Sequence, residues 1–398
     1  MPQRWLTPRR LRLHAMALLA ALWGVTAVNL ATRGAVTLNG HLKGEDYAHF
    51  YALGRIALAH DASDLYDSAA QTATIAGAIP DARPPTFVPV YGPQVALFFA
   101  VFAVVPYLVS LTLWWTVSTA VYLACCWQFW RRSPALAGAK PRFFLFALAY
   151  PGFWELIVHG QTSVLVLACF TLLWTALRDR NRPRHLLGGI ALGLLFYKPQ
   201  MGIAATVVLL ASAQWRVLTV AALTVVVQFA AAWAWFGWEA IAGYIRMLRL
   251  LPAVADLLEP NLSQMCSLRG VVQLLGVPEP WGLAAYAAAS SIVLAVLVHS
   301  WRTRPPAVGV ALLLLATILV APHATVYDLV ILAPALILLA NKAAAASPVH
   351  VPWLYAAYLA PLSGGLAALT HVQLIAPVLC VLFWTVVRTT RASPAVSA

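Results

Sequence analysis

Long apolar runs separated by short basic clusters are the feature that most constrains how this chain can fold. Apolar residues make up 62% of the chain, charged residues only 10%, and the mean hydropathy is +0.80. A soluble domain has about half apolar and about 25% charged residues. Because backbone polar groups in lipid must be satisfied within their own segment, these runs predict transmembrane helices. We therefore expect an all-α polytopic membrane protein.

The net charge of +13 does not indicate a nucleic-acid-binding protein, because the basic residues lie between the apolar runs. This arrangement follows the positive-inside rule, under which Lys and Arg stay on the cytoplasmic side. The five cysteines have neither metal-ligand spacing nor the pattern of a disulfide framework. The sequence also lacks a Walker loop and the GxGxxG, HExxH and GxSxG motifs. We predict no resident cofactor, no metal and no nucleic-acid partner, and the sequence does not indicate an oligomeric state.

The alternation of apolar runs and basic clusters predicts about 12 transmembrane helices, with both termini in the cytoplasm. Residues 1–398 would form one multi-pass domain in the inner (plasma) membrane, with extracytoplasmic loops at 33–107 and 237–282. The expected spans are 13–32, 108–130, 143–158, 162–177, 186–197, 201–212, 217–236, 283–301, 307–320, 326–341, 349–368 and 373–387.

The apolar stretch 93–130 is long enough for two spans, but a basic cluster that includes Arg131 and Arg132 follows it. Two spans would place these arginines outside the cell, against the positive-inside rule. We therefore expect 93–105 to form a short re-entrant or surface helix, and 108–130 to form a single span.

Two adjacent carboxylates, Glu45 and Asp46, lie in the first long loop. Asp46 is a candidate general base, because its aromatic neighbours favour a shifted pKa. Glu45 would be a neighbour that tunes it, and the alternative is that both carboxylates only solvate a loop. Apolar residues interleave with His49 and Arg55, which suggests a helix that lies on the membrane surface. Pro84-Pro85 should end any helix there.

Lys198 lies between two apolar runs, 186–197 and 201–212, that are too short to cross a bilayer comfortably. We expect this lysine in a polar cavity in the outer half of the membrane. A cation at such a low-dielectric position suits a phosphate group. The alternative is a lysine whose ammonium group snorkels to the surface.

Other polar residues lie at the outer ends of spans or in the second loop. His323 and His159 are candidates of this kind, although a lone histidine at a helix end is often structural. Arg269 could bind a lipid phosphate, as could Arg246 and Arg249. Nucleotide sugars are absent outside the cell, so an enzyme that acts there would need a lipid-linked sugar donor.

Several short motifs resemble, in their order and topology, those of the family 87 glycosyltransferases of the GT-C class. This class uses polyprenyl-phosphate sugars and includes mycobacterial mannosyltransferases that extend phosphatidylinositol mannosides. The resemblance covers most of the chain. Its motifs are Asp46-Tyr47, residues 51–55, Leu65-Tyr66-Asp67, Tyr91-Gly92-Pro93, Gly160-Gln161, Gly189, Gly193, Lys198-Pro199, Asn261-Leu262-Ser263 and Pro322-His323.

The resemblance implies a GT-C-like fold with juxtamembrane helices in the first outer loop. It implies inverting transfer of a hexose, which we expect to be mannose, from a polyprenyl-phosphate donor to a lipid-linked acceptor or a glycan. Asp46 would be the catalytic base, on the extracytoplasmic face. The expected substrate- and donor-binding residues are Lys198, His323, Gln161, Arg55, Tyr91, Asn261, Arg269 and Glu45.

Two other functions remain open from the residues themselves. One is a transporter or flippase of lipid-linked saccharides, which usually has internal repeats and polar residues near the middle of the membrane. Here the polar residues lie instead at the outer ends of spans and in two long loops. The other is a polysaccharide polymerase or ligase, in which Arg and His residues would form the site and Asp46 would be dispensable.

Overall fold

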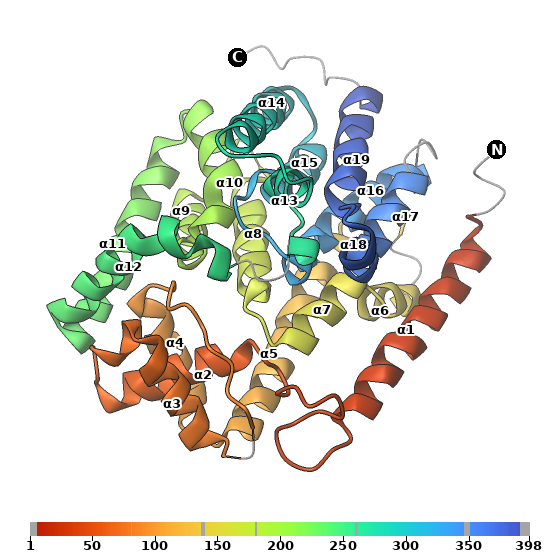
Figure 1. Cartoon of the computed structure of the whole chain (residues 1–398). Coiled ribbons are helices and arrows are strands. Elements are labelled where there is room, and N and C mark those ends of the chain that lie inside the picture. Colours follow the sequence, from red (N-terminus) through yellow and green to blue (C-terminus); the bar gives the residue numbers. More distant parts are fainter. Residues whose placement is uncertain are drawn as a thin grey trace.

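The computed structural model describes residues 6–80, 82–136, 140–179, 181–258, 262–345 and 351–390. Within these ranges the regular secondary structure is helical, and the β-type pairings are two isolated bridges, Val36 with Leu42 and Met265 with Thr325. The helices pack around one extended apolar core (Figure 1). The expectation of an all-α protein is confirmed.

Five helical segments of the described chain are long and apolar enough to cross a membrane. They are α1 (Pro8–Leu30), α5 (Tyr107–Trp130), α11 (Trp215–Phe236), α14 (Trp281–Thr303) and Val326–Ala345, which joins the 3₁₀ helix η5 (Val326–Leu332) to α16 (Ala333–Ala345). Shorter apolar helices are α4 (Pro93–Ala103), α8 (Ser163–Leu177), α9 (His185–Leu194) with the 3₁₀ helix η3 (Leu195–Tyr197), α10 (Pro199–Ala211), α15 (Pro306–Val320) and α19 (Ile375–Thr389). These lengths and compositions indicate a membrane protein.

Two expected spans are interrupted rather than continuous. Residues 143–158 divide into α6 (Lys140–Leu148) and α7 (Pro151–His159), because a proline disfavours helical backbone in the residue before it. Residues 349–368 divide into α17 (Val351–Leu359), the 3₁₀ helix η7 (Ala360–Ser363) and α18 (Gly364–Thr370). Each of these two expected spans is therefore a broken helix rather than a continuous one.

The stretch 93–130 divides as its flanking charges predict. The short helix α4 is followed by Val104, Val105 and Pro106, after which the long helix α5 begins. A proline has no backbone N–H and cannot continue a preceding helix without a break. The separation of 93–130 into one short and one long helix is confirmed.

The first loop holds α2 (Tyr47–Ala59), the 3₁₀ helix η2 (Asp64–Tyr66) and α3 (Ser68–Ala78). The position of helix α2 relative to the membrane surface stays a prediction, but the helix is buried by other parts of the chain over most of its circumference. The reason is that aromatic residues occupy several faces of α2, and all of them find packing partners. Gly54 brings α2 very close to α4, since a Cβ at this position would lie 2.5 Å from the carbonyl oxygen of Phe99. After α3, the proline-containing stretch 82–92 is not helical, as predicted.

The second loop contains α12 (Trp238–Leu258), the 3₁₀ helix η4 (Leu262–Gln264) and α13 (Leu268–Leu274). It reaches the turn before η5, where Met265 forms a bridge with Thr325 and the backbone N–H of Cys266 donates to Ala324 O at 2.8 Å. This pairing places the second loop against the Pro322-His323 motif.

The first and last parts of the described chain lie at one end of the molecule. Leu6 and Ala343 line the same cavity, and the ammonium group of neighbouring Lys342 donates to Thr390 Oγ1. Helices α2, α3 and α4 lie at the opposite end (Figure 1). The first loop is therefore separated from both terminal segments by the length of the helices.

Candidate active site

Asp46 joins the first loop to the turn between α7 and α8. It is the N-cap residue of α2, but its side chain does not cap the helix. Asp46 Oδ2 instead accepts a hydrogen bond from Gln161 Nε2 at 2.9 Å, and its backbone N–H donates to His159 O at 3.2 Å. The carboxylate is half-buried at the N-terminus of α2.

Two glycines in left-handed backbone conformations make this junction possible. Gly160 has φ +67°, and a Cβ there would lie 2.7 Å from Tyr47 Cβ. Gly44 has φ +62° just before the carboxylate pair. Helix α5 holds both turns, because Trp114 Nε1 donates to Gly160 O at 3.1 Å and the Tyr107 hydroxyl donates to Gly44 O at 3.1 Å.

Lys198 forms a buried cluster with a serine and a carboxylate. It lies between η3 and α10, and only 4% of the residue is exposed. Lys198 Nζ donates to Asp328 Oδ1 at 3.0 Å and to Ser163 Oγ at 3.0 Å, and the Ser163 hydroxyl also donates to Asp328. Nζ lies 5.2 Å from the centroid of the Tyr327 ring, within cation–π range. The alternative of a lysine that snorkels to the surface is wrong.

Asp328 is the site residue to which sequence reasoning assigned no role. Its Oδ2 accepts from the backbone N–H of Thr325 at 3.1 Å and from Thr325 Oγ1 at 3.4 Å, in a capping box at the start of η5. Two signals could have identified it. One is the Thr-x-x-Asp spacing of a helix start, and the other is a carboxylate at the edge of an apolar run, where a charge is expensive.

One turn of chain connects Asp46 to the cluster around Lys198. It consists of Gln161, Thr162 and Ser163. Gln161 donates to Asp46 and Ser163 accepts from Lys198, so two residues of one turn contact both side chains. Tyr91 interacts electrostatically with Lys198, Asp328 and Asp46. Burial raises its pKa, Lys198 lowers it, and the two carboxylates add to the rise. The structure therefore brings Asp46, Gln161, Tyr91 and Lys198 together.

Glu45 and Arg55 point elsewhere. Glu45 is exposed, and its Oε2 lies 3.8 Å from Nδ1 of His41 rather than beside Asp46. Arg55 is nine residues further along α2, which corresponds to about 13 Å at the rise of an α-helix. Its Nη1 donates to Ala103 O at 3.4 Å, and it lines a separate hollow with Thr74. The structure does not bring these two residues to the carboxylate of Asp46.

Of the remaining candidates, Arg269 and His323 lie where the second loop meets the turn before η5. Arg269 Nη1 donates to Pro322 O at 3.2 Å, so Arg269 lies against the residue before His323. His159 is a neighbour of the cluster, since its ring centroid lies 5.5 Å from that of Tyr327. Asn261 lies outside the described residues. In the part of the chain that the structure describes, no group of three or more His, Cys, Asp or Glu residues has the arrangement of a metal site.

Comparison with known proteins places the chain in a family. No curated protein and no solved structure matches it significantly. The family model of glycosyltransferase family 87, however, matches residues 90–322. This match includes Tyr91, Gln161, Lys198 and Arg269, and it covers more than half of the chain. The resemblance drawn from the motifs is therefore confirmed, and the chain belongs to glycosyltransferase family 87.

Proposed function

We propose that this glycosyltransferase moves a hexose, specifically mannose, from a polyprenyl-phosphate donor to a lipid-linked acceptor or a glycan. The reaction takes place on the extracytoplasmic face and inverts the anomeric centre. One observation carries the proposal. The half-buried carboxylate of Asp46 is held by Gln161, and Ser163 of the same turn holds a buried lysine. Transfer from a sugar phosphate requires a general base for the acceptor hydroxyl and a cation for the leaving phosphate, held close together.

Asp46 acts as the general base in this mechanism. One of its oxygens accepts from Gln161, which leaves the second oxygen for the hydroxyl group of the acceptor. The acceptor oxygen loses its proton to Asp46 and attacks the anomeric carbon from the face opposite the phosphate. The bond between this carbon and the phosphate oxygen breaks, and the polyprenyl phosphate leaves with the electron pair. One displacement at one carbon gives inversion.

Lys198 stabilises the negative charge that develops on the leaving phosphate. Its ammonium group has three N–H donors, of which Asp328 and Ser163 receive two. The third donor is available to a phosphate oxygen. Asp328 fixes the direction of the ammonium group, and at the same time reduces the net positive charge that a phosphate would meet. A second cation is therefore useful to this mechanism.

Arg269 and His323 are our candidates for additional donor contacts. Arg269 lies against Pro322, and the chain then continues through the bridge at Thr325 to Asp328. Asn261 of the same loop is proposed to join them. Glu45 and Arg55 are both exposed on the first loop. They would contact only an acceptor that extends along α2.

The proposal is tested with purified protein in vesicles, a radiolabelled polyprenyl-phosphate mannose and a panel of glycolipid acceptors. We expect Asp46→Asn to lower transfer by a factor of about 10²–10⁴, the usual contribution of a general base. Asp61→Asn is the matched control, because it removes an exposed carboxylate of the same loop, and it should retain most activity. If the Asp46→Asn protein folds normally and transfers sugar as well as wild type, Asp46 is not the general base. Transfer from a nucleotide sugar, and not from the polyprenyl-phosphate mannose, would rule out the proposed donor class.

A further inference from the structure

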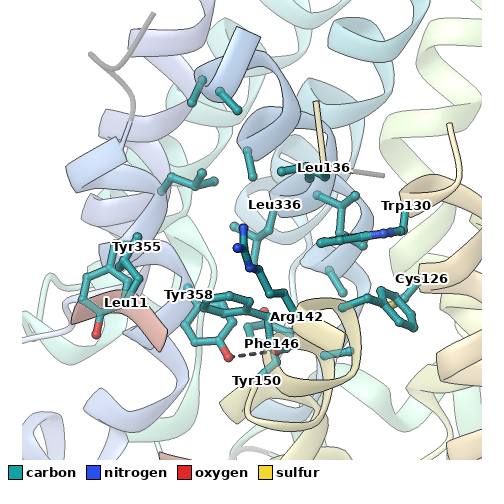
Figure 2. Close-up of a pocket in the computed structure, with 18 of the residues that line it drawn as sticks. Leu11, Cys126, Trp130, Leu136, Arg142, Phe146, Tyr150, Leu336, Tyr355 and Tyr358 are labelled. Atoms are coloured by element: carbon teal, nitrogen blue, oxygen red, sulfur yellow. Dashed lines mark hydrogen bonds between the residues drawn. The ribbon is translucent and has the colours of Figure 1, made fainter. Parts of the chain in front are cut away.

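A large cavity lies at the end of the molecule that carries the terminal segments (Figure 2). Its volume is about 480 Å³, within the range of about 300–1,000 Å³ that is typical of small-molecule sites. Its walls come from α1, α5, α6, α16 and α17. None of the candidate active-site residues that the structure describes lines it. The cavity is therefore a separate feature from the site around Asp46.

The floor of this cavity is chemically apolar, although it contains tyrosines. The Tyr122 hydroxyl donates to Ala147 O at 2.9 Å, the Tyr150 hydroxyl to Leu329 O at 2.7 Å, and the Tyr358 hydroxyl to Phe146 O at 2.9 Å. These hydroxyl groups already have protein acceptors, and their neighbours are Leu, Ile, Ala and Phe side chains. A cavity of this kind has little to offer a water molecule, which needs several polar partners. It suits a hydrocarbon chain.

The charged residues that line the cavity are both basic. They are Arg12 of α1 and Arg142 of α6, and both are exposed. Figure 2 shows the guanidinium group of Arg142 in the midst of the labelled lining residues. Arg12 Nε donates to Pro8 O at 3.4 Å, while a guanidinium group has five N–H donors in total. An apolar hollow with positive charge but no carboxylate among its described lining residues is complementary to an anion with a long apolar tail.

The cavity lies beside a lipid-facing helix, so an anion with a long apolar tail can reach it from the membrane. Helix α1 forms part of its wall, and the next turn of α1 exposes Leu13 (53%) and Met16 (56%), as expected of a helix that faces lipid. His14 of α1 forms a hydrogen bond of 2.8 Å with the Tyr355 hydroxyl of α17, which holds the two outer helices together beside the cavity. Phospholipids are therefore the amphiphilic anions next to its walls.

We infer that the cavity binds one anionic phospholipid from the membrane leaflet on the side of the chain termini. One acyl chain occupies the apolar floor between α5, α6 and α16. The phosphate is bound by Arg12 and Arg142, since a guanidinium group can donate two parallel hydrogen bonds to phosphate oxygens. This inference does not depend on the proposed sugar transfer.

The test uses purified protein in phosphatidylcholine vesicles that contain a small fraction of phosphatidylglycerol with a photoactivatable acyl chain. After irradiation, mass spectrometry of the peptides should locate the label on lining residues of α5, α16 and α17. Arg12→Gln and Arg142→Gln should each reduce labelling about fivefold, the order expected for one arginine near anionic lipid. Arg131→Gln is the matched control, because Arg131 is exposed beside the lining residue Trp130 but does not line the cavity. It should label like wild type.

A second variant tests the cavity itself rather than its charge. Ala340→Trp places an indole ring in the hollow and should abolish labelling of the lining peptides, while thermal unfolding and gel filtration report whether the protein remains folded. Three results would overturn the inference. They are equal labelling by the zwitterionic phosphatidylcholine probe, labelling that the arginine variants leave unchanged, and no labelling of wild type, which would mean that the chain itself fills the cavity.

Discussion

At the scale of single residues, the ion pair between Lys198 and Asp328 is the contact whose loss should matter most. Both side chains are almost fully buried, and the two atoms are 3.0 Å apart. We expect Asp328→Asn to destabilise the protein by about 3–5 kcal/mol, because it leaves a buried ammonium group without its counter-charge. The double variant Lys198→Met/Asp328→Leu should regain much of that stability but not sugar transfer.

Thermal unfolding of the detergent-solubilised protein and the transfer assay distinguish these two effects. The double variant is the control, since it removes both charges while it keeps similar side-chain volumes. If Asp328→Asn unfolds at the same temperature as wild type, the buried pair does not exist in the membrane protein.

His49 should make the fold sensitive to acid. Its side chain is buried among aromatic rings, and neither ring nitrogen has a hydrogen-bond partner. Burial lowers the pKa of His49 to about 3, whereas an unfolded chain has a histidine pKa of about 6.5. Below about pH 6.5 the unfolded state binds a proton that the folded state does not, so stability falls as the pH drops toward 3.

Replacing His49 by phenylalanine should remove this dependence. The unfolding temperatures of His49→Phe at about pH 7.5 and about pH 5 should differ less than those of wild type, because the ionisable group is gone. His371→Phe, which removes an exposed histidine, should keep the wild-type difference. A His49→Phe protein with the same acid sensitivity as wild type would mean that His49 is not buried in its neutral form.

The sequence predicts the polar residues of the site better than it predicts their partners. Asp46 and Lys198 could be identified because charges that border apolar runs are rare and expensive. That Asp46 rather than Glu45 points inward depends on how α2 begins, which only the fold determines. The pairing of Lys198 with Asp328 joins residues 130 positions apart, and no local pattern encodes such a contact.

At the scale of elements, the turn between α7 and α8 decides whether Gln161 reaches Asp46. Gly160→Ala would place a Cβ at φ +67° and 2.7 Å from Tyr47 Cβ. A left-handed conformation alone costs a non-glycine residue about 1–2 kcal/mol, and the steric contact adds to this cost. We expect lower thermal stability and a lower kcat for transfer, because the turn must shift away from α2.

The control for this variant is Gly77→Ala on the exposed face of α3. A Cβ at Gly77 meets no atom within 4 Å, and alanine favours a helix over glycine by about 1 kcal/mol. Gly77→Ala should therefore leave transfer unchanged and stability equal or higher. Wild-type kcat and stability in Gly160→Ala would show that the close contact between this turn and Tyr47 is not needed.

Local sequence signals predict where the helices begin and end, but they do not predict which helices are buried. Pro106 and the arginines after α5 correctly predict where the long helix begins and ends. Pro151 could have predicted the break between α6 and α7 if it had been treated as the first residue of a helix. The burial of α2 could not be predicted from its pattern. An interleaved aromatic pattern fits a membrane surface as well as it fits a helix packed between others.

At the scale of the whole molecule, the basic clusters gather at one end. The backbone N–H of Ala135, just after the arginines of α5, donates to Asn341 Oδ1 at 2.9 Å. The guanidinium group of Arg302 at the end of α14 donates to Ala211 O at the end of α10. These contacts join segments that are far apart in the sequence but share the same predicted cytoplasmic side. Charge could predict this arrangement because the positive-inside rule acts on the ends of all helices at once.

Cysteine labelling tests the orientation of this basic end in the membrane. The native cysteines other than Cys380 are buried, so Cys380→Ser provides a nearly silent background. We then introduce Asn39→Cys in the first loop or Arg182→Cys among the basic residues after α8, both at exposed positions. A membrane-impermeant maleimide should label position 39 in intact spheroplasts. It should label position 182 only after permeabilisation, because arginines there remain in the cytoplasm. The reverse result would place the basic end outside the cell. The Asp46 site would then face the cytoplasm, where nucleotide sugars are available and a lipid-linked donor is no longer required.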